Sequence, residues 1–89
     1  MSRPVDTKRA ICFYSLPDDL NKTAFRFELE NFGEVKDLEF PVKDNNWDNT
    51  CYVSFLYDSD LERLITQVPK IKFCGYQLKA KWSYIPVHQ

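Results

Sequence analysis

Apolar residues in this sequence gather in short runs that are separated by polar residues and turn formers. Two runs are rich in β-branched and aromatic residues and two others alternate between apolar and polar positions, and both patterns favour β-strands. Pro17 follows the first run and Gly75 precedes the last, and both residue types are typical of turns. The four predicted strands are residues 10–16 (AICFYSL), 35–42 (VKDLEFPV), 50–56 (TCYVSFL) and 76–82 (YQLKAKW).

A helix is predicted after the first strand. Phe25, Leu29 and Phe32 recur at i, i+4 and i+7, which places them on one helical face. Asn21 is a favourable N-cap residue, and Gly33 lies where the helix should end. We therefore expect a helix from Asn21 to about residue 31.

A second helix is predicted before the last strand. Ser59 and Glu62 have the spacing of a capping box, in which each side chain bonds a backbone N–H that the helix leaves unpaired. Pro69 should end the helix, because proline lacks the N–H that a continuing helix needs. The apolar stripe of this helix consists of Leu61, Leu64 and Ile65.

The resulting element order is βαββαβ, the ferredoxin-like arrangement of an α+β protein. It predicts a four-stranded antiparallel sheet with two helices on one face. The domain should span residues 10–83, with a flexible leader at residues 1–9 and a C-terminal tail at residues 84–89. That tail either covers the other face of the sheet or extends it.

Composition narrows the classes of function. The chain has 89 residues, which fits one domain, and 44% of them are apolar. It contains no apolar run long enough to span a membrane and no secretory signal pattern. Its net charge is −1, so any surface that binds nucleic acid must depend on local charge.

The cysteines indicate a reducing, intracellular environment. Cys12, Cys51 and Cys74 are far apart, and an odd number does not suit a closed disulfide framework. His88 is the single histidine, so the sequence lacks the closely spaced ligands of a structural zinc site. We expect neither a metal nor another cofactor.

Alternation along each strand predicts which side chains face away from the helices. Asp37 and Glu39 should lie on this outer face of the second strand, opposite Leu38 and Phe40. The remaining outward residues are Cys12, Tyr14, Thr50, Tyr52, Ser54, Lys79 and Lys81, and the inward ones are Ile11, Phe13, Cys51, Val53, Phe55, Leu78 and Ala80.

Three segments carry a resemblance to a known family. Residues 11–16 (ICFYSL) resemble the six-residue first-strand motif of the RNA recognition motif family, and residues 48–55 (DNTCYVSF) resemble its eight-residue third-strand motif. Residues 32–35 (FGEV) are similar to its junction between the first helix and the second strand. The likeness covers about residues 10–83 and implies the same fold.

The resemblance implies that single-stranded RNA binds the outer face through stacked bases and lysine–phosphate contacts. Tyr52 occupies one of the family's three aromatic positions, while Cys12 and Thr50 stand at the other two. Tyr14 lies one pleat further along the first strand. Asp48 and Asn49 replace the basic residue and glycine that usually open the third-strand motif. The RNA-binding residues implied are Tyr14, Tyr52, Lys79, Lys81, Cys12, Thr50 and Trp47.

This resemblance implies a role in RNA processing or regulation, with the nucleus favoured over the cytoplasm. The isolated domain is expected to be monomeric. Trp47 lies in a polar loop, where it either contacts a ligand or folds back onto the sheet edge. An alternative function is a protein–protein interaction domain of the same fold, with Phe27 as a contact, because helical spacing places Phe27 on the solvent side.

An enzymatic function is not expected. Cys12 is a nucleophile type, but no acid or base can be assigned as its neighbour. Some ferredoxin-like enzymes hydrolyse acyl phosphates with a glycine-rich loop that carries arginine after the first strand. Residues 17–20 (PDDL) contain neither glycine nor a cation.

Overall fold

The computed structural model describes residues 7–86. Its elements follow the predicted βαββαβ order, with two short hairpins added between the long strands. The long strands are β1 (Thr7–Phe13), β2 (Val35–Glu39), β5 (Cys51–Phe55) and β8 (Ala80–Pro86), and the helices are α1 (Lys22–Glu30) and α2 (Asp58–Gln67). The hairpins are β3 (Val42–Lys43) with β4 (Asn46–Trp47), and β6 (Lys72–Phe73) with β7 (Tyr76–Gln77).

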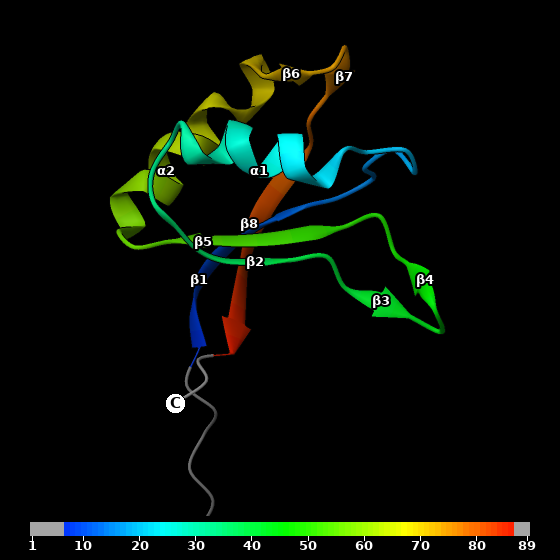
Figure 1. Cartoon of the computed structure of the whole chain (residues 1–89). Coiled ribbons are helices and arrows are strands. Elements are labelled where there is room, and N and C mark those ends of the chain that lie inside the picture. The colour runs from blue at the N-terminus through cyan, green and yellow to red at the C-terminus, as the bar shows by residue number, and fades with distance from the viewer. Residues whose placement is uncertain (1–6, 87–89) are drawn as a thin grey trace, which may run out of the picture.

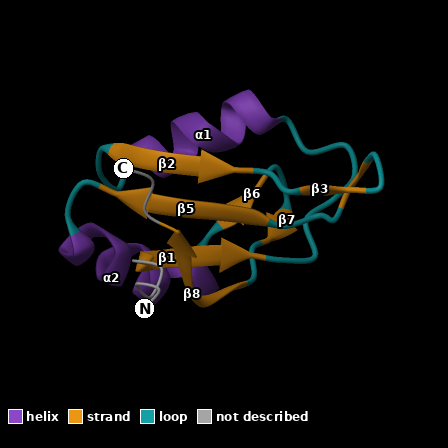
Figure 2. Ribbon diagram, turned by 90° about the horizontal axis from the view of Figure 1, so that it is seen from below, coloured by secondary structure: helices purple, strands orange, loops and turns teal. Residues whose placement is uncertain are grey.

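The long strands form one antiparallel sheet in the order β2-β5-β1-β8. Both helices cover one face of this sheet, and the opposite face carries no helix (Figures 1 and 2). The predicted ferredoxin-like α+β architecture is therefore confirmed. None of the helices within residues 7–86 is long and apolar enough to cross a membrane.

The core lies between the sheet and the helices. The ring of Phe13 on β1 meets that of Phe25 on α1 edge to face, with centroids 5.2 Å apart. Leu61 and Leu64 of α2 are fully buried in the same cluster. The inward faces predicted from alternation are confirmed, since this cluster includes Ile11, Phe13, Cys51, Val53, Phe55 and Leu78, with Ala80 packed against it.

The two helices begin differently. Asn21 caps α1 as predicted, and its side-chain oxygen accepts a hydrogen bond from the Ala24 N–H at 3.0 Å. The capping box predicted at Ser59 is wrong, because α2 already begins at Asp58 and its N-cap, Tyr57, makes no side-chain cap bond. Asp58 and Asp60 lie in the first turn instead, where their negative charges interact favourably with the positive end of the helix dipole.

The turn between α1 and β2 is held against α2. A Cβ atom at Gly33 would lie 2.5 Å from the Asp60 side chain, so a larger residue would displace that carboxylate. The guanidinium of Arg63 donates hydrogen bonds to the Phe32 carbonyl and to the Asp60 carboxylate. These contacts fix where β2 enters the sheet.

The last strand differs from the prediction of residues 76–82. Tyr76 and Gln77 pair with β6 across a tight turn, in which Cys74 and Gly75 have φ angles of 51° and 81°. β8 starts at Ala80 and pairs with β1 from Phe13↔Ala80 to Thr7↔Pro86. A two-residue turn with positive φ at both positions is the usual solution for such a hairpin, so the chain turns once before the final strand.

This pairing also changes the first strand, which spans Thr7–Phe13 instead of residues 10–16. Residues 7–9 of the expected leader and residues 84–86 of the expected tail therefore lie in paired strands. Residues 1–6 and 87–89 lie outside the described part of the chain. The polar loop expected around Trp47 contains part of the β3–β4 hairpin, with positive φ at Asp44 and Asn45.

Candidate nucleic-acid interface

We call the sheet face opposite the helices the open face, and Figure 2 views the sheet from this side. Strand register and alternation place ten side chains of the four strands on it, and Tyr14 directly follows β1. These ten are Lys8, Ala10 and Cys12 of β1, Asp37 and Glu39 of β2, Tyr52 and Ser54 of β5, and Lys81, Ser83 and Ile85 of β8.

A row of four open-face side chains crosses the sheet through Tyr52. Glu39 lies directly opposite Tyr52 on one side, and Cys12 lies opposite it on the other. On the far side of Cys12, Lys81 of β8 is its directly opposite partner. Neighbouring strands are about 4.8 Å apart, so Tyr52 is one strand from a carboxylate and two strands from an ammonium group.

Cys12 lies on the open face as predicted, but only 1% of it is exposed. It forms the floor between Tyr52 and Lys81 and cannot offer a surface to a base. Tyr52 is partly exposed, and contact with the Cys12 side chain raises the pKa of its phenol. The Tyr52 hydroxyl therefore stays protonated at neutral pH and can donate a hydrogen bond.

Tyr14 is the second aromatic residue on this face and is 37% exposed. Its backbone N–H donates to the Lys79 carbonyl at 3.1 Å, which holds it beside β8 just beyond the end of β1. The ammonium of Lys81 lies 5.7 Å from the centre of the Tyr14 ring. Lys79 and Lys81 are both exposed, and the Lys81 ammonium borders the Tyr14 ring.

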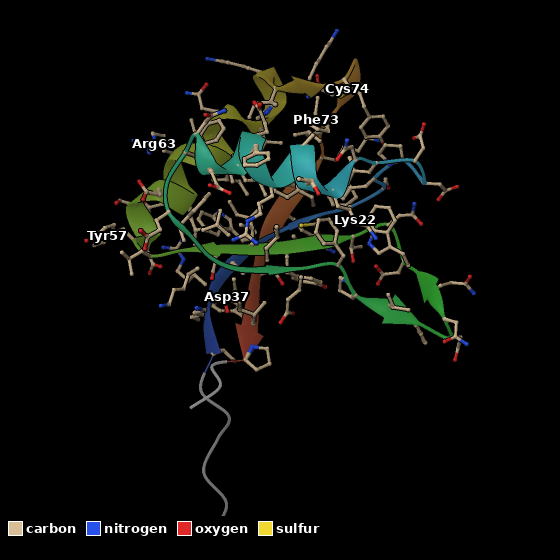
Figure 3. All side chains as sticks on the ribbon, in the orientation of Figure 1. Lys22, Asp37, Tyr57, Arg63, Phe73 and Cys74 are labelled. Carbon is tan, nitrogen blue, oxygen red and sulfur yellow. The ribbon has the colours of Figure 1, made fainter. Side chains whose placement is uncertain are left out.

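Another part of the open face is occupied by a polar network that sequence reasoning missed. The Lys8 ammonium pairs with the Asp37 carboxylate, and the Ser54 hydroxyl donates to the same carboxylate at 2.7 Å. Figure 3 shows Asp37 on the side of the sheet away from the helices. The prediction placed Lys8 in a leader, so only the longer β1 reveals this partner.

Comparisons with known proteins identify the fold. No protein-family model matches the sequence, and no curated protein matches it significantly. Solved structures do match. The crystal structure of RNA Binding Protein PG1 has a TM-score of 0.72 and 17% identity, over 85% of this chain and 94% of that one. The C-terminal RNA recognition motif of hypothetical RNA-binding protein RBM19 has a TM-score of 0.69 and 17% identity, over 100% of this chain and 86% of that one.

The RRM3 domain of Mip6 matches with a TM-score of 0.67 and 14% identity, over 85% of this chain and 93% of that one. The chain has the RNA recognition motif fold. At these identities the likeness shows the fold alone, so the role of each side chain must be argued from this structure.

The side chains of Trp47 and Thr50 are both held by contacts within the chain, unlike the exposed rings of the open face. The indole N–H of Trp47 donates to the Thr50 carbonyl at 2.8 Å, and its ring packs on Phe40 with centroids 6.0 Å apart. The Lys22 ammonium of α1 lies 4.6 Å from the centre of the same ring. Trp47 thus folds back onto the sheet edge. The Thr50 hydroxyl donates to the Asp48 carboxylate.

Other exposed aromatic residues lie away from the open face. Phe27, on the outer side of α1, is 64% exposed. Trp82 and Tyr84 on β8 are 41% and 64% exposed, and they point to the helix side of the sheet. The Arg9 guanidinium lies 4.1 Å from the centre of the Trp82 ring and bonds Glu62 of α2 at 3.3 Å. Arg9 thus links Trp82 to α2 on a surface separate from the open face.

A shallow hollow of about 360 Å³ lies between the loop after β1 and the β6–β7 hairpin. Its lining includes Pro17, Leu20, Phe73 and Tyr76, together with the exposed Cys74. Figure 3 places Phe73 and Cys74 on the opposite side of the molecule from Asp37. A ligand confined to the open face would not enter this hollow.

Proposed function

We propose that this chain binds single-stranded RNA on its open face and performs no chemical step. Bases stack on Tyr52 and Tyr14, and Lys79 and Lys81 bind the neighbouring phosphates. The observation that carries this proposal is the exposure of two tyrosines on a sheet face that no described helix covers. The likeness in fold to named RNA-binding proteins supports it.

Stacking on a protein aromatic ring contributes about 1–3 kcal/mol per base. Two rings therefore support roughly two stacked bases, and the buried Cys12 adds none. The Lys81 ammonium lies over the Tyr14 ring, an exposed contact that contributes about 0.5–1 kcal/mol. A base that stacks on Tyr14 would displace the Lys81 ammonium from the ring, and Lys81 would then bind a phosphate. The loss of the cation–π contact lowers the net free energy gained by stacking at Tyr14.

We place this activity inside the cell, in RNA processing or regulation, and favour the nucleus. Cys12, Cys51 and Cys74 are all free thiols in the structure, which supports a reducing compartment. The likeness in fold to named RNA-binding proteins supports the link to RNA.

The test is binding of short single-stranded RNA to the Tyr52→Ala and Tyr14→Ala variants, measured by fluorescence anisotropy. We expect Tyr52→Ala to weaken binding by roughly 5- to 150-fold, because one stacked base is lost. Tyr57→Ala is the matched control, since Tyr57 is 65% exposed at the start of α2, away from the open face (Figure 3). It should bind as the wild type does.

Mapping of amide chemical shifts on titration with RNA locates the contact. Shifts concentrated on β1, β5 and β8 around Tyr14 and Tyr52 would support the proposal. Wild-type affinity in the Tyr52→Ala variant, with folding unchanged, would rule out the assignment of the site.

A second candidate function is a protein–protein contact. The exposure of Trp82 and Tyr84 beside α2 favours it, because exposed aromatic residues are enriched where proteins meet. Phe27 offers a further apolar contact on α1. Shifts at Trp82, Tyr84 or Phe27 on adding a cell extract, with none on adding RNA, would favour this function.

A further inference from the structure

Charge is unevenly distributed over the open face. The carboxylates of Asp37 and Glu39 lie on β2, at one edge of the sheet. Lys79 and Lys81 lie at the opposite edge, just before β8 and on it, and the Lys81 ammonium lies over the Tyr14 ring. Tyr52 lies between these edges, so a nucleotide on its ring meets opposite charges on its two sides.

The two carboxylates of β2 are not equivalent. Asp37 is engaged by the Lys8 ammonium and by the Ser54 hydroxyl. Glu39 takes part in none of the side-chain hydrogen bonds or ion pairs found within residues 7–86, and it is exposed. Glu39 is also the residue directly opposite Tyr52. An unpaired hydrogen-bond acceptor therefore stands beside the aromatic ring.

This arrangement orients a nucleotide that stacks on Tyr52. Its phosphates are attracted to the lysines of the β8 edge and repelled by Glu39. The sugar and phosphates then lie toward β8, and the base directs its Watson–Crick edge toward β2. Directly opposed side chains have Cβ atoms about 5 Å apart, so the Glu39 carboxylate can reach that edge.

A carboxylate only accepts hydrogen bonds, so it distinguishes bases by their donors. Guanine presents two adjacent donors, the N1–H and the N2 amine, which match the two oxygens of one carboxylate. Uracil presents a single N3–H between two carbonyl oxygens, and these repel a carboxylate. A bidentate pair of this kind discriminates strongly between bases.

We propose that Glu39 selects guanine over uracil at the position stacked on Tyr52. The inference rests on the proposed RNA-binding function, and it adds the base preference and the residue that determines it.

The test compares a short oligouridine with the same oligomer that carries one guanosine. Wild-type protein should bind the guanosine oligomer roughly tenfold more tightly. Glu39→Gln should lose most of this preference and should bind oligouridine more tightly than wild type does, because a repulsive charge is removed. Glu34→Gln is the control, since Glu34 is exposed in the turn before β2 and its substitution changes the net charge equally.

Inosine in place of guanosine provides a second measure, because inosine keeps the N1–H and lacks the N2 amine. The affinity of the wild type for the inosine oligomer should fall between its affinities for the other two oligomers. Glu39→Gln should reduce the difference in affinity between the guanosine and inosine oligomers.

The outcomes separate this inference from the proposed function. Equal binding of the two oligomers by the wild type, with both weakened by Tyr52→Ala, would overturn the base selection and leave RNA binding intact. A guanine preference that persists in Glu39→Gln would overturn the role of Glu39. Failure of the wild type to bind either oligomer would overturn both proposals.

Discussion

Asp37 is held on the open face by two neighbours, and its protonation state affects the stability of the fold. Two hydrogen bonds hold the pKa of Asp37 below its ordinary value, and the bond from Lys8 has a larger effect than the bond from Ser54. A carboxyl group with a depressed pKa in the folded state stabilises the protein above its unfolded pKa, which is about 4. That contribution is lost as the pH falls through the lower pKa of the folded state.

We therefore expect Asp37→Asn to be less stable than wild type at neutral pH, and we expect the difference to shrink below about pH 4. The Asp37 side chain is 38% exposed, so solvent screening should keep the difference under about 1 kcal/mol. Urea unfolding at a series of pH values measures it. Glu39→Gln is the control, and a constant difference between wild type and Asp37→Asn across the series would contradict this account.

The predictability of single residues depends on what determines their burial. Alternation along one strand was enough to place Tyr14, Tyr52 and Lys81 on the open face. It did not indicate that Cys12 is buried there. The side chains that flank Cys12 are Tyr52 and Lys81 on the neighbouring strands, and only the register of the sheet places them beside it. Trp47 was ambiguous for the same reason, since its contacts come from Phe40, Thr50 and α1.

At the scale of elements, the two helix starts give a paired prediction. Asn21→Ala removes the side chain that accepts the Ala24 N–H and should lower the free energy of unfolding by about 1 kcal/mol. Ser59 lies inside α2 and caps no helix end, so Ser59→Ala should change the free energy of unfolding by less than about 0.5 kcal/mol. Denaturant unfolding monitored by circular dichroism compares the variants.

A loss at Ser59 as large as that at Asn21 would mean that α2 begins later in solution and uses the capping box. The sequence alone did not exclude this, because the Ser59 and Glu62 spacing is the same whichever residue caps the helix. What separates the possibilities is that helical geometry already begins at Asp58, one residue before Ser59.

Strand boundaries were less predictable than strand existence. Apolar and polar residues alternate from Tyr76 into β8, so the pattern did not mark where the β6–β7 hairpin ends and the last strand starts. The start of β1 at Thr7 depends on its pairing with Pro86, nearly the length of the chain away. Proline is tolerated there because β8 is an edge strand.

At the scale of the whole molecule, the element order and the helical spacing were sufficient for the fold, because few topologies bury two amphipathic helices on one sheet. The overall charge was uninformative about function. A net charge of −1 conceals the separation of carboxylates on β2 from lysines at the β8 edge, which only the assembled sheet reveals.

This charge distribution predicts how RNA binding depends on salt. With Lys79 and Lys81 as two phosphate contacts, the logarithm of the affinity should fall against the logarithm of salt concentration with a slope of about −1.4, at roughly 0.7 per contact for a single strand. Lys81→Gln should reduce the slope to about −0.7. Lys72→Gln, on the exposed β6 away from the open face, should leave it unchanged. A slope unaffected by Lys81→Gln would place the phosphates elsewhere on the molecule, and with them the orientation that brings a base edge to Glu39.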